Sequence, residues 1–142
     1  MPRKVGSMMK SRKFQRCVVL LGVSFALGGQ SAQATTPQAQ LQRWQEAAGQ
    51  TGEAARGQEF FGRRHGGEWS CASCHGQPPT APNRHAATGK SIAPLAPAFH
   101  AERFTDSAKV DKWFKRNCKD VLSRECTALE KADVLAYLIG LK

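Results

Sequence analysis

The five residues Cys71-Ala-Ser-Cys74-His75 constrain this chain more than any other part of its sequence. Two thiols three positions apart, followed at once by an imidazole, match the C-x-x-C-H spacing at which a c-type haem is covalently attached. Cys71 and Cys74 would form thioethers with the two vinyl groups, and His75 would be the proximal iron ligand. We therefore expect one covalent haem c, with the fold arranged around it.

Three other uses of this motif fit the sequence less well. A thioredoxin-like redox pair would have a strand before the motif and a helix after it. Here the motif is followed by Gly76-Gln-Pro-Pro79, which does not favour a helix. A zinc site lacks a second close pair of cysteines, because Cys118 and Cys126 are eight positions apart. A plain disulfide within the motif would leave its histidine without a role. Covalent haem attachment is the interpretation that uses all three residues.

The first 34 residues have the order of a secretory signal peptide. Six basic and no acidic residues precede an apolar run from Cys17 to Leu27, and Ala32-Gln-Ala34 forms a small-residue cleavage site. Eleven apolar residues are too few to cross a membrane, which takes about 20. We therefore predict a signal peptide at 1–34, cleaved after Ala34, and a monohaem cytochrome c domain at 35–142, located in the periplasm.

Cleavage would remove much of the chain's basic charge. The full chain has a formal net charge of +10, and residues 35–142 keep 15 Lys and Arg against 11 Asp and Glu, or +4. A modest positive charge favours an acidic redox partner through electrostatic steering. We expect that partner to be another cytochrome, with membrane contact only through it, and the chain itself to be a monomer. Nucleic-acid binding is not indicated, because no basic run with interleaved aromatic residues is present.

Helical patterns separated by loops predict an all-α domain. The predicted helices cover about 36–49, 52–61, 106–117 and 127–139. Thr36 before Pro37 is a typical N-terminal cap, and Thr127 with Glu130 forms a capping box. Gly57 in mid-helix costs about 1 kcal/mol relative to alanine, which predicts a close crossing with the last helix. The proline-rich residues 76–99 are expected to form a long loop that wraps the cofactor.

No methionine remains to bind the iron after cleavage. Small electron-carrying cytochromes commonly use a methionine thioether as the sixth ligand, but the methionines here are Met1, Met8 and Met9. The remaining candidates are His65, His85, His100, Asn83, Asn117, the lysines and water. Three histidines keep a low-spin bis-His electron carrier open, although each alone is typical of a surface or propionate-contacting group.

Four strings outside the haem motif point to one family. They are Thr88-Gly-Lys-Ser-Ile-Ala-Pro-Leu-Ala-Pro97, Arg103-Phe-Thr-Asp-Ser-Ala108, Arg116-Asn-Cys118 and Cys126-Thr127. With the motif they resemble the sphaeroides haem protein family, small class I c-type cytochromes with a high-spin haem, over about residues 52–141. The resemblance implies a class I cytochrome c fold, Asn117 as the sixth iron ligand, and a disulfide between Cys118 and Cys126.

The expected function is electron transfer with a capacity to bind small gases. An amide oxygen is a hard, weak donor that suits ferric iron better than ferrous iron. Reduction should therefore loosen Asn117 and allow O₂, NO or CO to bind. The alternative is a haem enzyme that acts on O₂, peroxide or nitrogen oxides. Catalysis would require an acid–base group within hydrogen-bond reach of the bound ligand; no spacing identifies one, so no catalytic residue is assigned.

Overall fold

The computed structural model describes residues 1–2 and 34–142, so the predicted signal peptide lies almost entirely outside the described residues. The helices are α1 (Pro37–Ala48), α2 (Ala54–Gly62), α3 (Cys71–His75), α4 (Ser107–Leu122) and α5 (Ala128–Gly140), with a 3-10 turn, η1 (Pro97–Phe99). In the described part the strands are β1 (Asn83–Arg84) and β2 (Ser91–Ile92), which pair antiparallel. Apart from this short ladder within the long loop, the domain is all-α as predicted.

Local signals fix most helix ends where the sequence predicted them. The Thr36 hydroxyl accepts a hydrogen bond from the Ala39 N–H at 3.1 Å, and Thr127 with Glu130 forms the predicted capping box. Helix α2 begins two residues later than predicted, because the Glu53 N–H donates to an Asp133 carboxylate oxygen at 2.7 Å and holds Glu53 extended. Glu53 is therefore the N-cap residue of α2, without a side-chain capping hydrogen bond, and does not lie in the first turn.

Helix α4 is longer than predicted. It continues five residues beyond Asn117 to Leu122 and ends at Ser123, whose φ of +59° is left-handed. The extension contains Cys118, which is buried, and Val121, which lines an internal cavity. Apolar burial keeps this turn helical past the point at which the sequence pattern weakens.

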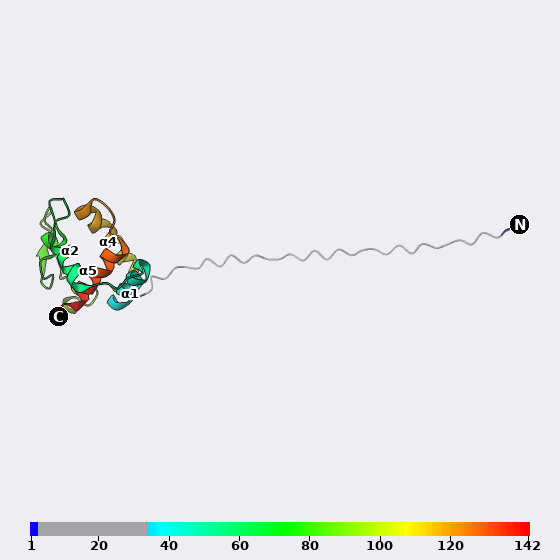
Figure 1. The fold of residues 1–142 in the computed structure, drawn as a ribbon, viewed down its shortest axis with the longest axis horizontal. Coiled ribbons are helices and arrows are strands. Elements are labelled where there is room, and N and C mark those ends of the chain that lie inside the picture. Colours follow the sequence, from blue (N-terminus) through cyan, green and yellow to red (C-terminus); the bar gives the residue numbers. More distant parts are fainter. Residues whose placement is uncertain (3–33) are drawn as a thin grey trace. The chain divides into compact units, whose positions relative to one another are not determined.

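Helix α5 packs against both α1 and α2 (Figure 1). A Cβ atom on Gly57 would overlap the Asp133 carbonyl oxygen and lie 3.0 Å from the Tyr137 Cβ, so the predicted close crossing is confirmed. Asp133 is only 6% exposed, and its carboxylate accepts hydrogen bonds from Arg56 Nε at 2.9 Å and Nη2 at 2.7 Å. The helix crossing therefore pairs the charge that it buries.

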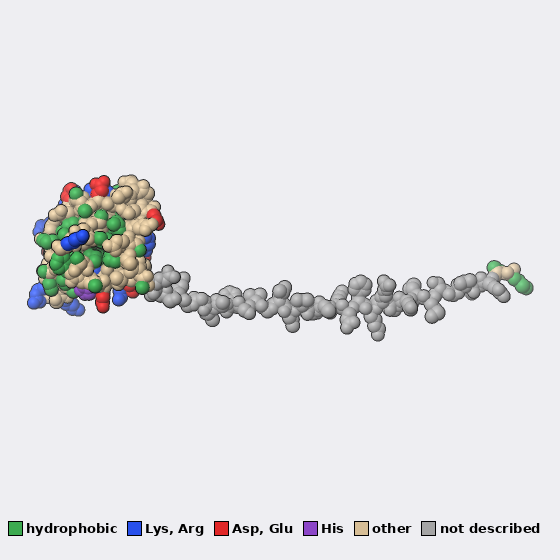
Figure 2. Space-filling view, turned by 90° about the horizontal axis from the view of Figure 1, so that it is seen from below, with side chains coloured by type: hydrophobic (Ala, Val, Ile, Leu, Met, Phe, Trp, Pro, Cys, Tyr) green, Lys and Arg blue, Asp and Glu red, His purple; other side chains and the backbone are tan. Residues whose placement is uncertain are grey.

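A small apolar core lies beside this crossing. Its members are Phe61, Val134, Tyr137 and Leu138. Partly buried side chains extend it toward α3 and α4, among them Cys71 and Phe114. Figure 2 shows that apolar side chains also gather on one face of the domain, with basic groups within and around them. None of the helices in the described part is both long and apolar enough to cross a membrane.

Candidate haem site

A cavity of about 550 Å³ opens between α3, α4, α5 and the loop after α3. This volume lies within the roughly 300–1,000 Å³ that is usual for cofactor sites. Its wall is largely apolar and aromatic, and includes Phe61, Leu95, Phe104 and Leu138. Such a lining suits a large flat apolar group better than a hydrated one.

Helix α3 brings the haem-motif residues to one wall of this cavity. Ser70 caps the helix through a capping box, and Gly76 follows it with a φ of +79°. One short helical turn then places Cys71, Cys74 and His75 along the cavity. The residues predicted to attach the haem are therefore brought together by local structure.

The protonation state of His75 suits iron binding. Both motif cysteines are free, and burial raises the pKa of Cys71 to about 11. Burial lowers the pKa of His75 to about 4, and the nearby Arg103 and His85 side chains contribute to the shift. The imidazole is then neutral at pH 7, which is the form that binds metals. Its Nδ1 atom is buried without a hydrogen-bond partner in the described part of the chain.

This set of groups fits a covalently attached haem. Cys71 and Cys74 would hold the porphyrin through two thioethers, and His75 would bind the iron from the same side. A bound haem supplies one-electron redox chemistry and a second axial position opposite the histidine. The remaining question is which side chain faces that second position.

Asn117 lines the same cavity from a different element, α4. The next residue, Cys118, is 4% exposed and forms a disulfide with Cys126, which is 8% exposed. The bond ties the last turns of α4 to the start of α5. Asn117 is therefore on a helix whose end is covalently held, and it lines the same cavity as His75.

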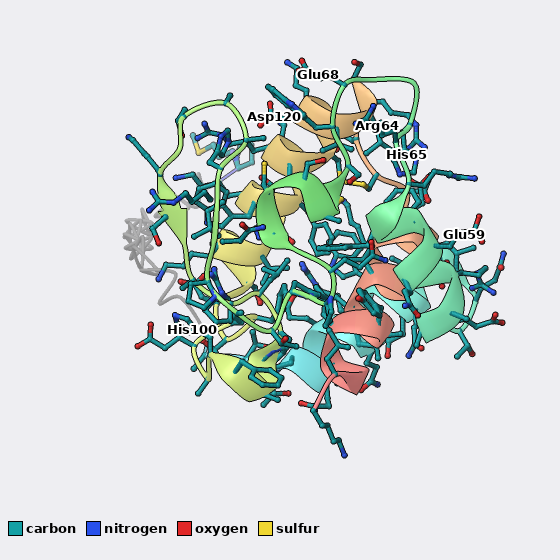
Figure 3. The ribbon with its side chains drawn as sticks, turned by 90° about the vertical axis from the view of Figure 1, so that its left-hand side faces the viewer. Glu59, Arg64, His65, Glu68, His100 and Asp120 are labelled. Carbon is teal, nitrogen blue, oxygen red and sulfur yellow. A yellow bond between two sulfur atoms is a disulfide. The ribbon has the colours of Figure 1, made fainter. Side chains whose placement is uncertain are left out.

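Two of the three other histidines lie away from the cavity. His65 Nε2 is 2.9 Å from the Phe60 carbonyl oxygen, and its ring centroid is 4.3 Å from that of Phe60. Neither His65, His100 nor Asn83 is part of the cavity wall. Figure 3 shows His65 near the end of α2 and His100 at the opposite side of the view, near η1. These three residues are poorly placed to bind the iron.

His85 does line the cavity, close to the attachment helix. Its ring Nδ1 accepts a hydrogen bond from the Ala87 N–H at 3.3 Å. The neighbouring Ala86 N–H points to Cys74 Sγ, also at 3.3 Å. His85 is therefore beside α3, whereas Asn117 comes from α4.

The cavity wall also contains charged residues that were not singled out from the sequence, apart from the lysines as a group of candidate ligands. They are Lys90, Glu102, Arg103, Asp106, Lys109, Arg116 and Asp120. Arg116 and Asp120 flank Asn117 on α4, with their side chains 3.9 Å apart. Asp120 is three positions after Asn117, so the two residues are neighbours on the helix surface. This could not be seen from the sequence, because the predicted helix ended at Asn117.

Comparison with known proteins identifies the family of this chain. A family model described as a domain of unknown function, DUF1924, matches residues 47–138. The cytochrome c-type protein SHP of Cereibacter sphaeroides is 45% identical over 121 residues, which cover 82% of this chain and 93% of SHP. The chain belongs to the sphaeroides haem protein family. Its cofactor is accordingly a covalently attached haem c.

Solved structures give the same fold. The structure of oxidized SHP, described as an oxygen-binding cytochrome c, matches with a TM-score of 0.67 and 44% identity, over 74% of this chain and 96% of SHP. The crystal structure of oxidized cytochrome c'' from Methylophilus methylotrophus matches with a TM-score of 0.69 and 33% identity, over 75% and 94% of the two chains. The predicted all-α cytochrome fold is confirmed.

Proposed function

We propose that this chain is an exported monohaem cytochrome that transfers electrons, and that its sixth ligand, Asn117, leaves the iron on reduction so that O₂, NO or CO can bind. The observation that supports this most is that Asn117 and His75 line one cavity from different helices. Oxygen binding by the similar SHP supports the gas-binding part. We further propose a periplasmic location, a monomeric state and another cytochrome as the electron-transfer partner.

The chemistry of an amide explains why the ligand would be labile. The Asn117 carboxamide oxygen is uncharged and hard, so it favours ferric over ferrous iron. A methionine thioether would favour the ferrous state, but the methionines of this sequence lie at positions 1, 8 and 9. Reduction of a bound haem by one electron would then weaken the hold of Asn117 on the iron. The site would be six-coordinate when oxidised and open when reduced.

The disulfide limits how far Asn117 can move. Closing a loop of about nine residues stabilises the folded chain by roughly 2.5 kcal/mol in the chain-entropy model. Because Cys118 follows Asn117 directly and is bonded to Cys126, the backbone at the end of α4 is held in place. Loss of the ligand would then be a side-chain rotation rather than unfolding of the helix. This would let Asn117 return when the iron is oxidised again.

The test is the absorption spectrum of the Asn117→Ala protein. We expect it to lose the ferric spectrum of the parent protein, and we expect the dithionite-reduced parent to be high-spin and to bind CO rapidly. Asn83→Ala is the matched control, since it removes the same carboxamide from a residue outside the cavity wall. His65→Ala and His100→Ala should likewise keep the parental spectrum.

An Asn117→Ala protein with the parental ferric spectrum would overturn the ligand assignment. A reduced parent with split α and β bands that ignores CO would instead support bis-His ligation. His85→Ala then decides that alternative, because among residues 34–142 His85 is the histidine besides His75 that lines the cavity.

A haem enzyme acting on O₂, peroxide or nitrogen oxides is the second candidate. It is favoured by Asp120 and Arg116, which line the cavity on either side of Asn117. A carboxyl group near a bound ligand is a possible proton donor. Steady-state consumption of peroxide or nitrite by the reduced protein, lost in Asp120→Asn with its spectrum unchanged, would support this second function.

A further inference from the structure

The guanidinium of Arg103 lies in the cavity wall and is held there by the backbone of the long loop. Its Nε donates to the Pro94 carbonyl oxygen and its Nη2 to the Ala93 carbonyl oxygen, both at 2.8 Å. Phe104, the next residue, also lines the cavity and has a φ of +62°, a left-handed conformation that bulky residues rarely adopt. The Arg103 side chain is thus tied to the loop at Ala93 and Pro94, and the backbone that follows it turns at Phe104.

The Arg103 guanidinium forms no ion pair with any of the described residues. Among the described residues, no carboxylate lies within 4.0 Å of it, and its Nη1 makes no hydrogen bond. Burial lowers the pKa of Arg103. A partly buried cation is normally paired, because removing it from water is costly. An anion inside the cavity would supply the counter-charge that the neighbouring side chains do not.

We propose that Arg103 is a positioning residue that binds a propionate carboxylate of the haem through its free Nη1, and so links the haem to the loop at Ala93 and Pro94. A guanidinium is planar with donors on three nitrogens, so it can bond two carbonyl oxygens and a carboxylate at once. The proposal rests on haem c in this cavity, as the proposed function does, but not on the role of Asn117.

The pairing has a measurable effect on the iron. A positive charge close to the haem disfavours the additional charge of ferric iron and so raises the reduction potential. It also keeps the propionate ionised, because an adjacent cation lowers the pKa of a carboxylate. Without Arg103, the potential should fall, and it should change more steeply with pH as the propionate gains and loses its proton.

The experiment compares Arg103→Gln with Arg84→Gln in the haem-containing protein. Arg84 is an exposed control that also donates to a backbone carbonyl, that of Gly89 at 3.1 Å, but it does not line the cavity. Midpoint potentials are measured by spectroelectrochemistry from pH 5 to pH 8 at fixed ionic strength. We expect a lower and more pH-dependent potential in Arg103→Gln, a smaller shift in Arg103→Lys, and no change in Arg84→Gln.

Equal potentials in Arg103→Gln and the parent would overturn the proposal, and so would an equal shift in Arg84→Gln. If Arg103→Gln retains no haem, the resonance Raman propionate-bending band is compared between Arg103→Lys and the parent. A shifted band supports the pairing, and an unshifted one rules it out. Since these readouts do not depend on the sixth ligand, Asn117→Ala separately tests the proposed function.

Discussion

The crossing of α2 and α5 and the cavity beside it differ in how their charged side chains are paired. At the crossing, the buried Asp133 carboxylate accepts hydrogen bonds from the Glu53 N–H and from two nitrogens of Arg56. In the cavity, His75 Nδ1 is buried without a partner and Arg103 has no nearby carboxylate among the described residues.

Buried polar groups in native proteins are nearly always paired. The crossing therefore pairs its buried carboxylate within the protein, although the Tyr137 hydroxyl there is buried without a partner among the described residues. The Arg103 guanidinium in the cavity wall has no such carboxylate, and a bound haem would bring carboxylates of its own. This small domain therefore has one part stabilised by helix packing and one part stabilised by its cofactor. Two predictions concern how these parts fail, and a third concerns the start of α5.

The largest effect is expected from Cys71→Ala with Cys74→Ala, which removes both sites of covalent attachment. Haem should then separate from the chain in denaturant. The free energy of unfolding should fall by at least about 4 kcal/mol, the contribution of a ligand present at a thousand times its Kd. Hydrogen exchange shows which region loses stability. The amides of α2 and α5 should stay better protected than those of residues 76–105. Uniform loss of protection would contradict the division into two parts.

A smaller effect is expected from Gly57→Ala at the crossing. The added methyl would overlap the Asp133 carbonyl oxygen, so the helices must separate, at a net cost of about 2 kcal/mol after the gain in helix propensity. Urea unfolding checks this, and the haem spectrum should not change. Gly140→Ala is the control, because a Cβ there meets no atom within 4 Å. Equal stability of Gly57→Ala and the parent would show that the crossing is loosely packed.

The smallest effect is expected from Glu130→Gln at the start of α5, away from both regions. Hydrogen bonds from Arg124, at 2.6 and 2.8 Å, lower the pKa of Glu130, so its stabilising effect is present above the ordinary carboxyl pKa of about 4.3 and is lost as pH falls through its folded value. Glu130→Gln should therefore cost roughly 0.5–1 kcal/mol at pH 7 and less as the pH is lowered toward 3.

Urea midpoints at the two pH values measure this difference. Glu125→Gln is the control, because that carboxylate is exposed and lies 3.7 Å from Lys115. A Glu130→Gln protein whose deficit does not depend on pH would mean that the capping geometry matters and the charge does not.

Features that depend on neighbouring residues could be predicted from the sequence. The C-x-x-C-H spacing predicted the haem and the residues that attach it, and the caps at Thr36 and Thr127 predicted where helices begin, because each involves groups within three or four positions of one another. The short helix over Cys71–His75 was not predicted. Gly57 predicted the crossing because a glycine in mid-helix lowers helix stability and a close contact between helices gives it a reason. The lack of a usable methionine predicted an unusual sixth position.

Which side chains share the cavity could be learned only from the tertiary structure. Histidine count left His65, His85 and His100 equivalent, and packing then removed His65 and His100 from its wall and kept His85. Arg103 acquired a role only when the loop folded back to place the carbonyls of Ala93 and Pro94 beside it. Contacts between residues distant in sequence depend on how helices and loop pack around one volume, and no local pattern in the chain records that arrangement.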